Sequence, residues 1–261
     1  MRRHFELTVI WCKIMCNVLE FRRSAKKYGL KRRRPTPGRE SQLVRDFVRI
    51  YAKTLVGKYD YAVFIEPRIP IGCPDCVIVQ YDPSVYALWK ASRKMLTDCD
   101  MKILFYLSQM RKRTLDEIVL GLGMSRSIVR NSLHVLLHNG DIIEQMGVFV
   151  VRKKIPSFGI KRIMSVEAKI KDWRQVVQQA QLNQLFANYS FVLMPNRVCS
   201  PQMKLCLAEA DVGLFVLSKL AGLRKVRAVR RLSKFQSYLP LYFNEWIGWR
   251  LISLKRRNGY G

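Results

Sequence analysis

Apolar side chains recur along this chain at two spacings, and these separate predicted helices from predicted strands. A repeat of three to four residues is typical of a helix with one buried face, and alternation or a short apolar run is typical of a strand. Helices are predicted at residues 40–55, 100–110, 114–120, 125–138, 174–186 and 201–210. Strands are predicted at residues 61–66, 74–81, 142–145, 148–151, 161–170, 191–194 and 214–218. This mixture predicts an α/β (α+β) fold with a mixed central sheet flanked by helices.

The segment from residue 95 to residue 154 has a hydrophobic pattern of its own. Thr114 followed three residues later by Glu117 is typical of a capping box, and Asn139-Gly140 is expected to begin a hairpin. Three helices followed by two strands resemble a winged helix-turn-helix domain, in which the third helix enters the DNA major groove. The resemblance implies DNA contacts from the third helix and from the end of the hairpin, by Arg126, Arg130, Asn131, His134, Arg152, Lys153 and Lys154. The alternative is that this domain binds another protein.

Two short apolar segments, one on each side of this domain, carry a carboxylate. The first reads Cys73-Pro74-Asp75-Cys76-Val77-Ile78-Val79, and the second reads Met164-Ser165-Val166-Glu167-Ala168-Lys169. Because strand side chains alternate between the two faces of a sheet, Glu167 and Lys169 are expected to point the same way. Two carboxylates and a lysine on neighbouring strands could hold a divalent cation and a phosphate.

Pro74-Asp75 followed by Glu167-x-Lys169 resembles the PD-(D/E)xK, restriction-endonuclease-like nuclease superfamily. The resemblance implies an αβββαβ core that hydrolyses DNA phosphodiester bonds with Mg²⁺, for which Mn²⁺ can substitute. The catalytic residues that it implies are Asp75, Glu167, Lys169 and Gln179, and the metal ligands are Asp75, Glu167, the main-chain carbonyl of Ala168 and Glu66. Glu40 is a further candidate ligand, and the alternative is an acid favoured by the dipole at a helix start. A homodimer is expected from the resemblance alone.

Gln179 is assigned from a longer match. Similar nucleases share a run that here reads Asp172-Trp173-Arg174, Gln179-Ala180, Phe186-Ala187 and Tyr189-Ser190-Phe191-Val192. In those relatives a helix glutamine at this place lies beside the metal. The alternative is an ordinary polar residue on a half-exposed helix.

The charge of the chain indicates its class of partner. Lys and Arg number 47 and Asp and Glu number 19, which gives a formal net charge of +28. Such a charge favours a polyanionic partner, and nucleic acid is the first candidate. The sequence is therefore interpreted as a DNA endonuclease whose winged helix grips or selects duplex or branched DNA. The alternatives are a non-catalytic DNA-binding regulator on a decayed nuclease scaffold and a basic RNA-associated factor. No G-x-x-x-x-G-K-[ST] loop is present, so no nucleotide cofactor is expected.

These patterns divide the chain into four parts. Residues 1–35 form a basic N-terminal segment, with an expected helix up to Leu19 and then a basic run that is either a phosphate-binding arm or a solvated tail. The nuclease core is discontinuous and comprises residues 36–94 and 155–235, and residues 95–154 form the inserted winged helix. Residues 219–234, within the core, are basic and are a second candidate for phosphate binding. Residues 236–261 form an aromatic and basic segment, expected to pack as a helix on the core.

Membrane and disulfide signals are weak. No apolar run reaches the roughly 18 to 20 residues that a membrane span needs, so no membrane partner is expected. The seven cysteines lack disulfide-like spacing, which favours the reducing cytoplasm. A zinc site is the lesser alternative for four of them, Cys12, Cys16, Cys73 and Cys76, and buried apolar packing is the favoured interpretation.

Overall fold

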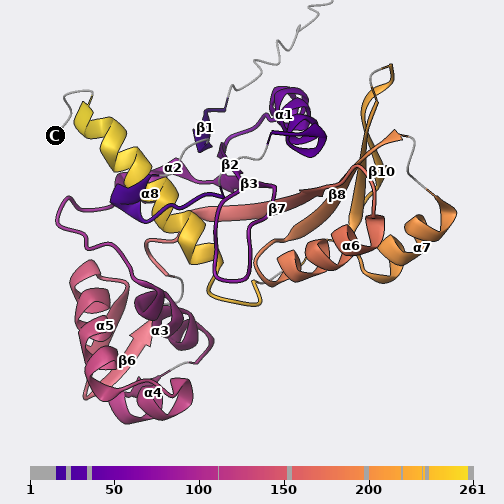
Figure 1. The fold of residues 1–261 in the computed structure, drawn as a ribbon. Coiled ribbons are helices and arrows are strands. Elements are labelled where there is room, and N and C mark those ends of the chain that lie inside the picture. The colour runs from indigo at the N-terminus through magenta and orange to yellow at the C-terminus, as the bar shows by residue number, and fades with distance from the viewer. Residues whose placement is uncertain are drawn as a thin grey trace, which may run out of the picture.

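A seven-stranded mixed sheet forms the centre of the molecule (Figure 1). The computed structural model describes residues 16–21, 25–33, 37–110, 112–151, 155–196, 200–218, 220–230, 232 and 235–257. The strands lie in the order β1 (Val18–Phe21), β2 (Asp60–Ile65), β3 (Cys76–Tyr81), β7 (Ile160–Ala168), β8 (Tyr189–Pro195), β9 (Gly213–Ser218) and β10 (Gly222–Arg227).

Strand direction changes across the sheet. β2, β3 and β7 are successively antiparallel, whereas β7, β8 and β9 are parallel. β1 lies parallel to β2 at one edge, and β10 lies antiparallel to β9 at the other. The predicted hairpin of β2 and β3 is confirmed, and the chain between β3 and β7 leaves the sheet without interrupting it.

Helices cover both faces of the sheet. Alternate residues of β8 point to opposite sides, as strand geometry requires. Phe191 and Leu193 pack in the core under α1 (Arg39–Tyr51), whereas Val192 and Met194 pack in the core beneath other helices. Those helices are α6 (Trp173–Leu182) and α7 (Pro201–Glu209), which Figure 1 shows below the sheet with α1 above it. The predicted mixed sheet flanked by helices is confirmed.

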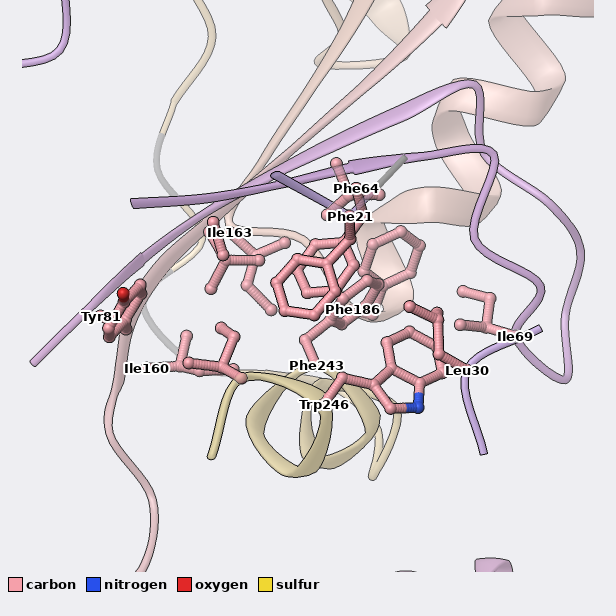
Figure 2. Packing of buried hydrophobic residues seen from close by; sticks show 14 of the residues in the cluster. Phe21, Leu30, Phe64, Ile69, Tyr81, Ile160, Ile163, Phe186, Phe243 and Trp246 are labelled. Atoms are coloured by element: carbon pink, nitrogen blue, oxygen red, sulfur yellow. The ribbon is translucent and has the colours of Figure 1, made fainter. Parts of the chain in front are cut away.

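An aromatic core fixes the C-terminal helix α8 (Pro240–Arg257) against the sheet (Figure 2). The ring centres of Phe64 and Phe243 are 5.2 Å apart, and those of Phe21 and Phe64 are 4.3 Å apart. Trp246 closes the cluster, with its ring centre 5.3 Å from that of Phe243. Burial of each such side chain stabilises the fold by roughly 1.5–3 kcal/mol. The expected packing of the C-terminal segment as a helix on the core is therefore confirmed.

The inserted residues form a small helical domain with a core of its own. It contains α3 (Asp98–Gln109), β4 (Arg113–Thr114), α4 (Leu115–Leu122), α5 (Arg126–Asn139), β5 (Ile142–Gln145) and β6 (Val148–Val151). The predicted capping box is present, because Thr114 N–H donates to Glu117 and Glu117 N–H donates to the Thr114 hydroxyl. β4 pairs with β6. It was not predicted, because a strand of two residues is too short to show alternation of apolar and polar side chains.

Short elements complete the path of the chain. The helix α2 (Pro83–Ala87) follows β3 and begins the connection to the inserted domain. Short 3-10 turns occur at Lys26–Tyr28, Ala52–Thr54 and Asn183–Leu185. The last of these extends α6 and carries Asn183 into the interior.

The N-terminal segment differs from its expectation. The prediction of a helix up to Leu19 is wrong at its C-terminal end, because Val18–Phe21 forms the strand β1. Pairing with the open edge of β2 supplies backbone hydrogen bonds that outweigh the local helical spacing. Tyr28 and Leu30 are buried in the aromatic core, so the described part of residues 1–35 belongs to the main fold. The earlier part of the predicted helix lies outside the described residues.

Candidate active site

Asp75 and Glu167 come together at one end of two neighbouring strands. Asp75 directly precedes β3, and Glu167 lies near the end of β7. The register pairs Cys76 with Val166, which sets Asp75 beside the end of β7. The Ala168 N–H donates to Asp75 Oδ2 over 2.8 Å and holds the two segments together. The sequence separated these two acids by ninety-two positions, and the antiparallel pairing of β3 with β7 removes that separation.

Glu167 is a buried carboxyl group with one neutral partner. Its residue is 5% exposed, and Asn183 Nδ2 donates to its Oε1 over 2.7 Å. Burial, and then the nearby charge of Asp75, raise the pKa of Glu167 to about 8. Burial also raises the pKa of Asp75, against the lowering effects of the Ala168 N–H and of the Arg33 charge. The site therefore favours an added positive charge, or a proton, between the two carboxyl groups.

Two arginines of the N-terminal segment lie against these acids. Arg33 Nη2 is 3.1 Å from Glu66 Oε1 and 3.2 Å from Asp75 Oδ1. Arg32 Nη2 is 3.6 Å from the other oxygen of Glu66. Glu66 has a φ of 50°, which is uncommon for a residue with a side chain and is often found at functional sites. Glu66 is thus held by arginines beside Asp75.

Lys169 and Glu40 form a separate ion pair at the site. Lys169 Nζ is 3.4 Å from Glu40 Oε2, and the Ile170 N–H donates to Glu40 Oε1 over 3.4 Å. Glu40 stands in the first turn of α1, where a negative charge also favours the helix dipole. Both interpretations of Glu40 are therefore compatible with its position, and the pair fixes the end of β7 to the start of α1.

A cavity of about 850 Å³ opens in front of Asp75, Glu66, Lys169 and Glu40, whereas the buried Glu167 does not line it. Ten of its lining residues have ionisable side chains: Arg32, Arg33, Arg39, Glu40, Arg45, Glu66, Asp75, Lys169, Lys171 and Asp172. Six of these ten are cations, so the cavity is suited to an anionic ligand. Gln175 of α6 also lines it.

Gln179 is not brought to the cavity. It is exposed on α6 and does not line the site, whereas Gln175, one turn earlier, does. The helix turns its apolar face, with Val176 and Ala180, to the sheet, which directs Gln179 to solvent. The placement of Gln179 beside the metal is therefore corrected, and the amide that contacts Glu167 comes from Asn183. Asn183 shares the buried face with Val176, but its spacing alone is that of a core position.

The sequence patterns also did not identify Arg33 as a site residue. Its partner Asp75 is 42 positions away, and the basic run around it is typical of a solvated tail. No local pattern indicates that a single member of such a run contacts a carboxylate, so only the fold can single it out.

The acids present provide two adjacent carboxylates for a metal. Among the described residues, no group of three or more His, Cys, Asp or Glu side chains is arranged to bind an ion. Mg²⁺ does not need such a group, because it is commonly bound by one or two carboxylates, with water and substrate phosphate completing its shell. Asp75 and Glu167 fit that requirement. Glu66 could bind the same ion only if Arg32 and Arg33 moved away from its carboxylate.

The zinc alternative gains nothing from the described cysteines. Cys73 Sγ donates to the Glu66 carbonyl oxygen over 3.1 Å, and Cys76 is fully buried in the sheet. Cys12 lies outside the described residues.

The residues expected to contact DNA lie on the outside of α5. Arg126, Arg130, Asn131 and His134 are all exposed, whereas Val129 and Leu133 face the core of the inserted domain. Arg126 forms an ion pair with Asp116 of α4. The remaining three expected contacts, Arg152, Lys153 and Lys154, lie outside the described residues.

Comparisons with known proteins found no relative of this chain. No protein-family model, no curated protein and no solved structure matches this chain. In the part of the chain that the structure describes, no helix has the length and apolar character needed to cross a bilayer.

Proposed function

We propose that this protein is a metal-dependent nuclease that hydrolyses DNA phosphodiester bonds. The observation that carries the proposal is the hydrogen bond from the Ala168 N–H to Asp75, which holds Asp75, at the cavity wall, against the segment that carries Glu167 and Lys169. The order α1, β2, β3, β7, α6, β8 also follows the αβββαβ order that the resemblance to PD-(D/E)xK nucleases implies. Cations on the cavity wall suit a substrate with a phosphate backbone.

Asp75 and Glu167 would hold the metal, and a bound Mg²⁺ would lower the pKa of a water and neutralise charge on the phosphate. Asn183 fixes the orientation of the Glu167 carboxylate through its amide. Lys169, which sits at the cavity wall, would stabilise negative charge that develops on the phosphate. Arg33 would exchange its carboxylate partners for a phosphate oxygen when the DNA backbone enters the cavity.

The inserted domain would grip the substrate. Its helix α5 presents an exposed polar face of Arg130, Asn131 and His134, which is the kind of surface that reads or clamps duplex DNA. Branched DNA is an equally suitable substrate, because a general positive charge recognises backbone shape as readily as sequence.

The test is a cleavage assay with supercoiled, linear and branched DNA, each with Mg²⁺ or with EDTA. We expect wild-type cleavage with Mg²⁺ only, and a loss of at least about 100-fold in Asp75→Asn, because a metal ligand is removed. Asp46→Asn on α1 is the matched control, since Asp46 pairs with Arg49 and does not line the cavity. Wild type that cuts no substrate, or equal cutting by Asp75→Asn, contradicts the proposal.

A second readout follows the metal without cleavage. Mn²⁺ should raise the melting temperature of wild type and of Asp46→Asn, because a ligand that binds only the folded state stabilises it. Asp75→Asn should show little or no such increase. An increase of equal size in all three proteins would mean that Asp75 does not hold the ion.

A non-catalytic DNA-binding regulator is the second candidate. It is favoured by Arg33, whose guanidinium contacts both Asp75 and Glu66 and so competes with a metal. Under this alternative, wild type binds duplex DNA in a mobility-shift assay and cuts none of the three substrates.

A further inference from the structure

A second cavity lies on the α1 face of the sheet, far from the acids. It has a volume of about 470 Å³ and is bounded by the C-terminal end of α1 and by the far ends of β2, β3 and β7. Arg162, on its wall, is five residues before Glu167 on β7, which is about 17 Å along a strand. The cavity is thus separate from the candidate active site.

We call this cavity the tyrosine pocket, defined by Tyr51, Tyr61, Gln80, Arg162, Tyr189 and Lys225. Its wall is aromatic and cationic, and no Asp or Glu is among the described residues that line it. The volume lies within the roughly 300–1,000 Å³ that is typical of small-ligand sites.

Strand register places the polar members side by side. Tyr61 pairs with Gln80, and Gln80 pairs with Arg162, so the three form one row across β2, β3 and β7. Residues that face each other in neighbouring strands project from the same side of the sheet. Gln80 Nε2 donates to the Tyr61 hydroxyl oxygen over 2.8 Å. Within the described part of the chain, that bond leaves the Gln80 amide oxygen and the Tyr61 hydroxyl proton available to a ligand.

Arg162 and Tyr189 already form a cation–π pair. The guanidinium carbon of Arg162 lies 5.3 Å from the centre of the Tyr189 ring. A guanidinium plane and an aromatic ring are the two surfaces on which proteins stack unpaired nucleobases. Lys225 is exposed on the edge strand β10 and adds a cation at the mouth of the pocket.

We propose that the tyrosine pocket binds one nucleotide of a single-stranded nucleic acid. The base would stack on the Arg162–Tyr189 pair and hydrogen-bond to Gln80, and Lys225 would contact a neighbouring phosphate. Stacking of one base on such a surface strengthens binding by about fivefold or more and tolerates any base. The absence of acids from the described wall favours a phosphate-bearing ligand over an uncharged or basic one. This site is independent of whether the cavity at Asp75 cuts DNA.

The test compares two fluorescent hexamers, one of thymidine and one abasic, which carry the same number of phosphates. Binding is measured in EDTA, so that cleavage plays no part. Wild type should bind the thymidine hexamer at least about fivefold more tightly, because only that hexamer can stack. Equal affinity of wild type for both hexamers overturns the proposal.

Variants then assign the preference to the pocket. Tyr189→Leu and Arg162→Ala should each remove most of the preference for the thymidine hexamer, whereas Tyr189→Phe, which keeps the ring, should retain it. Lys225→Ala should weaken both hexamers alike, and the matched control Lys204→Ala on α7 should weaken neither as much. A preference that survives in both Tyr189→Leu and Arg162→Ala overturns the proposal.

Photocrosslinking of wild type avoids reliance on the folding of variants. A hexamer with one 5-iodouracil is irradiated with the protein, and the crosslinked peptide is identified by mass spectrometry. A crosslink at Tyr51, Tyr61 or Tyr189 supports the pocket. Crosslinks confined to other parts of the chain contradict it.

Discussion

At the scale of single residues, the charge state of Glu167 decides what its site can do. A carboxyl group that is buried beside Asp75 keeps its proton up to a pH near 8 unless a cation shares the space. Asn183 donates one hydrogen bond, which stabilises the ionised form but does not offset burial. A divalent cation would supply the missing positive charge, so metal binding and release of the Glu167 proton are expected to be coupled.

This coupling predicts a pH dependence of stability. The pKa of Glu167 is raised in the folded state, so the folded protein binds more protons than the unfolded one between about pH 4.5 and pH 8. Its stability in EDTA should therefore fall across that interval as the pH rises. Glu167→Gln keeps the acceptor for Asn183 and removes the charge, so its stability should exceed that of wild type by on the order of 5 kcal/mol at pH 9.

Urea unfolding at several pH values measures this difference. Glu144→Gln, at an exposed position of β5, is the control and should follow wild type at every pH. A gap between wild type and Glu167→Gln that does not change with pH would show that Glu167 is ionised at all of them.

Sequence patterns could predict the acids of the site and Lys169, but not Asn183 or Arg33. Asp75 and Glu167 each stand at the end of a short apolar segment. A carboxylate at such a position is visible in the sequence and indicates a candidate site residue. Asn183 has the spacing of a core residue, and Arg33 belongs to a run of like charges. Their roles depend on contacts across the fold, such as the 42 positions between Arg33 and Asp75.

At the scale of elements, the sequence predicts helices better than edge strands. The start of α4 carries a capping box that is readable as Thr114 and Glu117, and the structure contains it. β1 and β10 are edge strands, each with one strand neighbour in the sheet, so their sequences carry little alternation. β10, with Arg224 and Lys225 exposed, lies within the basic element expected at residues 219–234.

Helix α5 allows a prediction about DNA binding. Arg130 is exposed, whereas Arg126 is already paired with Asp116, so Arg130 is the freer cation for a phosphate. Arg130→Ala should weaken duplex binding roughly tenfold at low salt, with a salt slope lower by about one. The effect of Arg126→Ala should be smaller. Fluorescence anisotropy in EDTA at several salt concentrations measures both quantities.

The control for this prediction is Lys204→Ala, which removes an exposed cation from α7. If Arg130→Ala leaves affinity and salt slope as in the control, the inserted domain does not touch DNA and a protein partner becomes the better interpretation. Loss of affinity for one DNA sequence alone would indicate a base contact by Arg130.

At the scale of the whole molecule, a buried ionic cluster joins the inserted domain to the sheet domain. Arg93 Nη1 is 3.1 Å from Asp141 Oδ2 in the inserted domain, and its Nη2 is 2.9 Å from Glu245 Oε1 in α8. All three side chains are almost fully buried. Leu241 of α8 also packs into the core of the inserted domain. The exposed face of α5 and the candidate active site are thereby held in one arrangement.

Removal of Arg93 tests this connection. Arg93→Leu leaves Asp141 and Glu245 buried without a cation, which costs about 3–5 kcal/mol at pH 7. Burial raises the pKa of both acids while the charge of Arg93 lowers it, so both pKa values should rise further in the variant. The variant should therefore recover stability as the pH falls towards 5, because protonation neutralises the two unpaired acids.

Combining Arg93→Leu with Asp141→Asn and Glu245→Gln should restore most of the loss at pH 7. Urea unfolding gives each value, with Arg174→Leu, an exposed arginine of α6, as the control. A loss below about 1 kcal/mol for Arg93→Leu at pH 7, or a loss that does not shrink in acid, would show that the cluster does not hold the two parts together.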